Sequence, residues 1–124
     1  MKRLKISVVD DSISARMLLK QAIQEAIEDD YLIFEAKDGI EAVELYKNET
    51  PDIVFMDLTM PNMNGMDALR EIRKLNDKAA VVIITADRQK ETKKELIADG
   101  ACDVLNKPVD VQELKDVYQK IIGR

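Results

Sequence analysis

The chain has 124 residues, the length of one ordinary domain, with a net charge of −5 and only five aromatic side chains. This balance argues against direct nucleic-acid binding, and the absence of histidine excludes histidine-based zinc sites and Ser-His or Cys-His nucleophile pairs. The single Cys102 excludes an internal disulfide, and the lack of a signal peptide or a long apolar run predicts a cytoplasmic protein with no membrane insertion.

Short apolar runs alternate with longer segments of helical spacing along the whole chain. In chain order the runs predict strands at residues 6–9, 32–34, 53–56, 81–84 and 104–105. Apolar residues three or four positions apart predict helices around residues 15–26, 40–46, 69–72, 91–98 and 111–121. The fourth of these helices has the narrowest apolar face. Asp110 and Glu113 predict a cap at the start of the last one.

The spacing of the strands predicts how they are connected. They recur about 21 to 28 residues apart with a helix between each pair, which leaves room only for right-handed crossovers. We therefore predict an α/β fold: an open, doubly wound parallel sheet of five strands in three layers, with helices on both faces.

Reactive side chains follow four of the five predicted strands. Asp10 and Asp11 follow the first strand, Asp57 the third and Thr85 the fourth, and Lys107 comes two residues after the fifth. Each alone is more simply a turn residue, a helix cap or a surface lysine. However, the carboxyl ends of parallel strands share one edge, where ligands bind. With the strand order 2-1-3-4-5 these four strands are contiguous, so the pattern favours a single site.

The three predicted neighbouring carboxylates need a cation. At a separation of 4 Å and an effective dielectric constant of 20 they repel one another by about 4 kcal/mol per pair. The ligands on offer are hard oxygens, which favour Mg²⁺ or Mn²⁺. A divalent ion, a lysine and a hydroxyl around one carboxylate are the parts of a phosphoryl-transfer site, in which the carboxylate itself is the nucleophile.

Four segments resemble the motifs of the receiver domain of two-component response regulators, in the same order and spacing. They read VVDDS at residues 8–12, MDLTMP at 56–61 with a glycine at 65, ITA at 84–86 and NKP at 106–108. The resemblance implies the flavodoxin-like strand order 2-1-3-4-5. It also implies one receiver domain over residues 1–124 with no output domain, and a signalling module that catalyses only its own phosphorylation and dephosphorylation.

The resemblance assigns roles to the residues that match the motifs. Asp57 is implied as the phospho-acceptor. Asp10, Asp11 and Asp57 are implied as ligands of Mg²⁺ or Mn²⁺, together with the backbone carbonyl of Thr59.

The implied phosphoryl-binding residues are Thr59, Thr85, Ala86 and Lys107, with Ala86 acting through its backbone amide. The bond between Lys107 and Pro108 resembles one that receivers hold in cis.

One departure from the family pattern concerns signal output. Receivers usually carry Phe or Tyr at the position of Val104, so the aromatic half of the usual switch is missing. Because the chain has no histidine, a phosphohistidine donor must come from a partner, a histidine kinase or a histidine phosphotransfer protein. We expect a surface change read by a downstream effector protein, as in CheY-like chemotaxis or phosphorelay regulators.

Other interpretations remain open from the sequence. The chain fits a receiver cut from a larger regulator. A magnesium-dependent aspartyl-phosphate phosphatase of the haloacid dehalogenase type would need Asp-x-Asp after a strand, where this chain has Ser12 and Thr59. A flavodoxin-like electron carrier would need a hydroxyl-rich phosphate loop and flavin-stacking aromatics. A docking module that works without phosphorylation is the last alternative.

Overall fold

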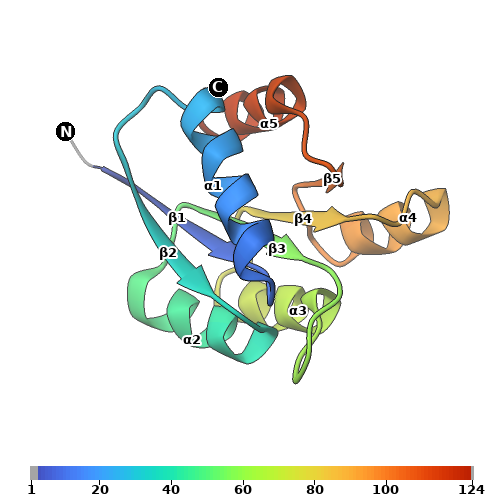
Figure 1. The fold of residues 1–124 in the computed structure, drawn as a ribbon. Coiled ribbons are helices and arrows are strands. Elements are labelled where there is room, and N and C mark those ends of the chain that lie inside the picture. The colour runs from blue at the N-terminus through green and yellow to red at the C-terminus, as the bar shows by residue number, and fades with distance from the viewer. Residues whose placement is uncertain (1–2, 124) are drawn as a thin grey trace.

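Strands and helices alternate along the chain, as Figure 1 shows. The structure is a computed structural model that describes residues 3–123. In chain order the elements are β1 (Leu4–Val9), α1 (Ile13–Ala26), β2 (Tyr31–Ala36), α2 (Gly39–Glu49), β3 (Ile53–Asp57), α3 (Gly65–Leu75), β4 (Val81–Thr85), α4 (Lys90–Ala98), β5 (Asp103–Asn106) and α5 (Val111–Tyr118). A π-helical turn, η1 (Gln119–Gly123), continues α5.

The five strands form one parallel sheet in the order β2-β1-β3-β4-β5. Helices α1 and α5 cover one face, and α2, α3 and α4 lie on the other side (Figure 1). Each face buries its own hydrophobic cluster, with Ile23 and Leu114 in the first and Leu69 and Leu96 in the second. The predicted doubly wound, three-layer α/β fold is therefore confirmed.

The burial of the central strands explains why apolar runs in the sequence predicted the strands correctly. Every residue of β3 and β4 is buried, as expected for central parallel strands covered by helices on both faces. Each strand is longer than its apolar run, because ladder pairing continues into polar residues such as Glu35 of β2 and Asn106 of β5. The π-helical turn at the end of α5 was not predicted.

Polar caps set where the helices begin near the carboxyl edge of the sheet. The side chains of Ser12, Asn64 and Asp110 accept hydrogen bonds from backbone amides in the first turns of α1, α3 and α5. The predicted Asp110 cap is thus confirmed, with its bond donated by the amide of Glu113. None of the helices formed by residues 3–123 combines the length and the apolar character that crossing a bilayer requires.

Candidate functional site

Three carboxylates meet at the carboxyl edge of the sheet. Asp10 and Asp11 follow β1 and Asp57 ends β3, and one oxygen of each lies within 4.8 Å of the others. Asp10 and Asp57 are buried, whereas Asp11 is exposed. Clustered carboxylate oxygens without a nitrogen or sulfur donor fit a hard divalent cation such as Mg²⁺.

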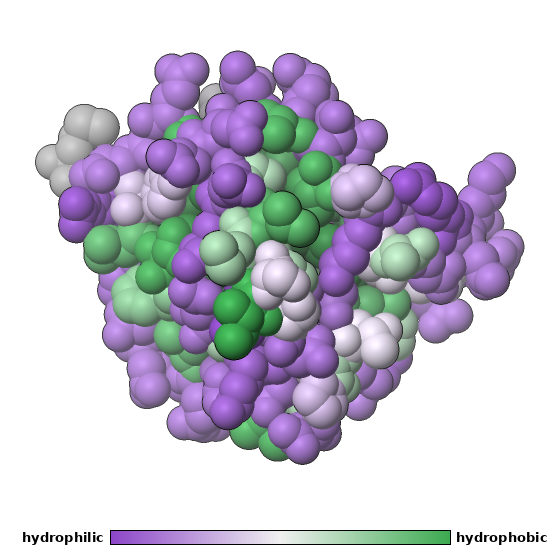
Figure 2. Space-filling model, in the orientation of Figure 1, coloured by the Kyte–Doolittle hydropathy of each residue, from purple (hydrophilic) through white to green (hydrophobic). Residues whose placement is uncertain are grey.

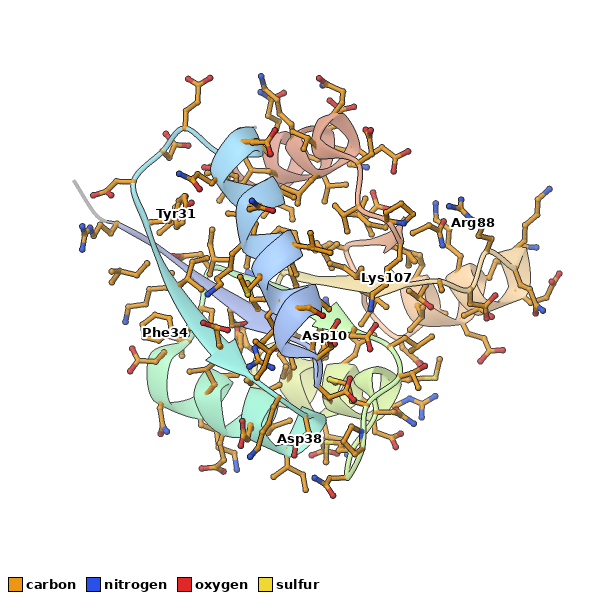
Figure 3. The ribbon with its side chains drawn as sticks, in the orientation of Figure 1. Asp10, Tyr31, Phe34, Asp38, Arg88 and Lys107 are labelled. Carbon is orange, nitrogen blue, oxygen red and sulfur yellow. The ribbon has the colours of Figure 1, made fainter. Side chains whose placement is uncertain are left out.

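A lysine from the loop after β5 joins the acidic group. The Nζ atom of Lys107 lies 3.0 Å from Asp57 Oδ1 and 3.1 Å from Asp10 Oδ2. Figure 3 shows Asp10 and Lys107 close to one another at the ends of their strands. Lys107 comes directly before Pro108, and the bond between them is cis, as the resemblance implied.

The lysine and the carboxylates alter one another's proton affinity. Burial raises the pKa of Asp57 above the ordinary aspartate value, and the charge of Asp10 adds to this, although the hydrogen bond from Lys107 opposes it. Burial alone lowers the pKa of Lys107, but hydrogen bonds to Asp57 and Asp10 outweigh this effect and raise it. The lysine therefore remains a fixed positive charge.

Asp10 is anchored through both its backbone and its carboxylate. Its Oδ1 atom accepts a hydrogen bond of 2.9 Å from the amide of Ser12, and its Oδ2 accepts from Lys107. Its amide donates to the carbonyl of Ala36 at the end of β2. Its own carbonyl accepts a 2.7 Å hydrogen bond from the guanidinium of Arg16. These bonds fix the turn that leads from β1 into α1.

Thr85, the last residue of β4, is buried at the same edge. Its hydroxyl oxygen accepts from the amide of Asp87, which leaves the hydroxyl proton available for donation to another group. The carboxylate of Asp87 in turn accepts from the hydroxyl of Thr92 in the first turn of α4. The side-chain Nδ2 of Asn106 donates to the carbonyls of Thr85 and Asp87. The loop thus connects Thr85 to α4 and β5.

The loop after β3 packs closely behind Asp57. A Cβ atom at Gly65 would overlap the backbone carbonyl oxygen of Asp57, so only glycine fits there. The amide of Gly65 donates to the carbonyl of Leu58 and closes the loop. At the tip of the loop, Asn62 has a φ of 65° and donates a 2.7 Å hydrogen bond to the buried carboxylate of Asp38.

A cleft of about 440 Å³ opens beside α1, with Asp57 and Lys107 among its lining residues. Its apolar lining includes Leu18, Pro108 and Val111. Figure 2 shows hydrophobic surface gathered over and beside α1, where three apolar side chains are more than half exposed: Ile13, Met17 and Leu18. The acidic group is therefore open to a molecule that approaches along α1.

The structure brings Asp10, Asp11, Asp57 and Lys107 into one cluster, with Thr85 on the strand next to that of Asp57. The other two predicted site residues, Thr59 and Ala86, are exposed in the loops that follow β3 and β4. Sequence reasoning assigned no role to the residues that support the cluster: Arg16, Glu35, Asp87 and Asn106. The position of Arg16 near the start of a predicted helix could have pointed to it. A cation there interacts unfavourably with the helix dipole and therefore needs a partner that accepts hydrogen bonds.

Comparisons with a family model and with known proteins all indicate the same family. A family model described as the response regulator receiver domain matches residues 6–119. The chain is 39% identical to the chemotaxis protein CheY of Thermotoga maritima over 117 residues, covering 94% of this chain and 96% of the relative. It is 30% identical to sporulation initiation phosphotransferase F of Bacillus subtilis, covering 95% of this chain and 93% of the relative.

Solved structures agree with the sequence relatives. A chain of the CheX-CheY-BeF3-Mg+2 complex of Borrelia burgdorferi superposes with a TM-score of 0.86 at 30% identity, covering 95% of this chain and 88% of that one. The chemotaxis response regulator CheY4 of Vibrio cholerae gives a TM-score of 0.84 at 28% identity, covering 98% and 100%.

Proposed function

The chain belongs to the response regulator receiver domain family, and we propose that it takes a phosphoryl group from a partner's phosphohistidine onto Asp57. The observation that carries this proposal is the contact of Lys107 with Asp57 inside a group of three carboxylates. Residues 1–124 would act as one receiver domain in phosphorelay signalling, with no catalysis beyond its own phosphorylation and dephosphorylation.

The proposed reaction forms an acyl phosphate. A carboxylate oxygen of Asp57 attacks the phosphorus atom, the bond from phosphorus to the donor imidazole nitrogen breaks, and the departing imidazole takes up a proton. The lysine contact favours the ionised, nucleophilic form of Asp57 against the effect of burial. The cleft beside α1 gives a donor side chain access to this carboxylate.

The remaining site residues would bind the charges of the reaction. Asp10, Asp11, Asp57 and the carbonyl of Thr59 would hold Mg²⁺ or Mn²⁺, which when bound neutralises charge on the phosphoryl oxygens.

The groups expected to bind the transferred phosphoryl group come from three loops. Lys107 would contact a phosphoryl oxygen, and Thr85 would donate its hydroxyl proton to another. The backbone amide of Ala86 would add a further hydrogen bond, and Thr59 would contribute from the loop after β3.

Two kinds of protein partner follow from this proposal. The phosphoryl donor would be a histidine kinase or a histidine phosphotransfer protein, since this chain has no histidine of its own. The receiver would then signal through a surface change to a downstream effector. The complex that joins CheX, CheY, BeF3 and Mg+2 in Borrelia burgdorferi supports both the metal and a protein partner.

A direct test uses acetyl phosphate as a small phosphoryl donor in the presence of Mg²⁺. Intact mass spectrometry should find one added phosphoryl group on the wild type and none on Asp57→Asn. The matched control is Asp77→Asn, an exposed aspartate outside the site, which should be labelled as the wild type is. Labelling of Asp57→Asn would overturn the assignment.

A further inference from the structure

We propose that Arg16 is a positioning residue for the acidic group, holding the peptide between Asp10 and Asp11 in the orientation that metal binding requires. This inference rests on the proposed function, because it concerns the same acidic group. Nothing in the motif pattern points to Arg16, which acts through a backbone carbonyl and touches none of the three carboxylates in the hydrogen bonds it forms.

The guanidinium of Arg16 is held at two points. Its Nη1 donates a 2.7 Å hydrogen bond to the carbonyl of Asp10, and its Nε donates a 2.8 Å bond to Glu35 Oε1. Only 16% of the Arg16 side chain is exposed. Glu35 lies near the end of β2 and is also bound by Lys20 at 2.9 Å. Strand β2, which carries no predicted site residue, therefore supports the site through Arg16.

The bonded carbonyl controls the direction of Asp11. Because a peptide unit is planar, fixing the carbonyl oxygen of Asp10 also fixes where the nitrogen and Cα of Asp11 lie. The carboxylate of Asp10 has its own anchors in Ser12 and Lys107, whereas Asp11 is exposed. The placement of the Asp11 carboxylate thus depends on the backbone that Arg16 holds.

Positioning and plain electrostatics predict opposite effects for the loss of Arg16. If only its charge mattered, removing a cation near the acidic group would strengthen the binding of a divalent metal ion. If Arg16 positions the turn, its removal weakens metal binding. Loss of a residue that orients a metal ligand typically costs about tenfold or more in affinity. The direction of the change therefore decides between the two explanations.

Lys20 provides a matched control. It makes the same kind of ion pair with Glu35 and carries the same charge, but its hydrogen bond goes to Glu35 alone, not to Asp10. The variants Arg16→Gln and Lys20→Gln therefore lose equal charge and one Glu35 contact each. Only the first loses the bond to the Asp10 carbonyl.

The experiment measures Mn²⁺ affinity by the electron paramagnetic resonance signal of the free ion, with wild type, Arg16→Gln and Lys20→Gln. We expect Arg16→Gln to bind about tenfold more weakly and Lys20→Gln to stay within about twofold of the wild type. In metal-free protein, the backbone amide resonance of Asp11 should shift in Arg16→Gln and stay in place in Lys20→Gln. Wild-type affinity in Arg16→Gln, or equal weakening in both variants, would overturn the proposal.

A second variant covers the case in which Arg16→Gln does not fold. Glu35→Asp keeps every charge but shortens the side chain that orients the guanidinium, so weaker Mn²⁺ binding supports the proposal and unchanged binding overturns it. The phosphorylation of the wild type separates the two proposals. If the wild type neither binds Mn²⁺ nor accepts a phosphoryl group, both proposals are wrong. If the wild type does both and Arg16→Gln binds Mn²⁺ equally well, only the positioning role of Arg16 is wrong.

Discussion

The Lys107 ammonium group lies 3.0 Å from a carboxylate oxygen of Asp57, at the point where β3 and β5 bring two distant parts of the chain to one edge of the sheet. This lysine is shared between Asp57 and Asp10. One cation shared in this way does not fully offset the burial of Asp57 or the charge of Asp10, and the pKa of Asp57 remains raised.

This raised pKa predicts how the stability of metal-free protein depends on pH. The folded state binds the Asp57 proton more tightly than the unfolded state does, so folding loses stability as pH rises through the folded pKa. Asp57→Asn removes that loss and should raise the free energy of unfolding at pH 7. The gain should shrink as pH falls toward about 4, the ordinary aspartate pKa.

Urea unfolding of wild type and Asp57→Asn at several pH values, with a chelator present, checks this prediction. Asp77→Asn serves as the control for the loss of one charge, since this residue is exposed. A gain that does not change with pH, or a loss of stability at pH 7, would contradict the raised pKa of Asp57.

Removing the exposed carboxylate should weaken the metal site without disturbing the fold. Asp11→Ala takes away one of the three carboxylates proposed to hold the metal ion, so phosphorylation by acetyl phosphate should slow by about tenfold or more at limiting Mg²⁺ and recover in part at high Mg²⁺. It should also relieve repulsion and raise the stability of metal-free protein. Initial rates over a Mg²⁺ series give the measurement. A wild-type rate at limiting Mg²⁺ would show that Asp11 is only a turn residue.

The third prediction concerns how the phosphorylated state is transmitted. Beryllofluoride, which mimics the phosphoryl group, should shift amide resonances between residues 85 and 107, because Thr85 is bonded to the loop that ends in α4. Val104 has one stiff torsion and little reach, so we expect a graded movement of this loop instead of the rotation of an aromatic ring.

Substitutions at Thr85 test that route. Thr85→Val removes the hydroxyl at nearly constant shape and should abolish most of the shifts at Asp87 and Thr92, whereas Thr85→Ser should keep them. Phosphorylation of Asp57 should still occur in both variants. If beryllofluoride shifts amide resonances only in α1 and none between residues 85 and 107, the conformational change is transmitted to another face of the molecule.

The fold and the central cluster were predictable because they depend on local pattern. Asp10, Asp57 and Thr85 each follow an apolar run, and parallel strands carry such residues to a common edge whatever the loops do. The support from Arg16 and Asn106 was not predictable in this way. Each of these side chains bonds to a carbonyl whose position depends on how a loop packs, and periodicity carries no information about that.

Gly65 has no reactive atoms, yet the backbone around Asp57 requires its small size. Any larger residue there would push against the carbonyl of Asp57 and shift the strand end that presents the carboxylate. In a deep mutational scan of phosphorylation, position 65 should therefore tolerate as few substitutions as position 57. Such a scan would not distinguish Gly65 from the residues whose side chains act in the site. Gly65 contributes only by lacking a side chain that would collide with the carbonyl of Asp57.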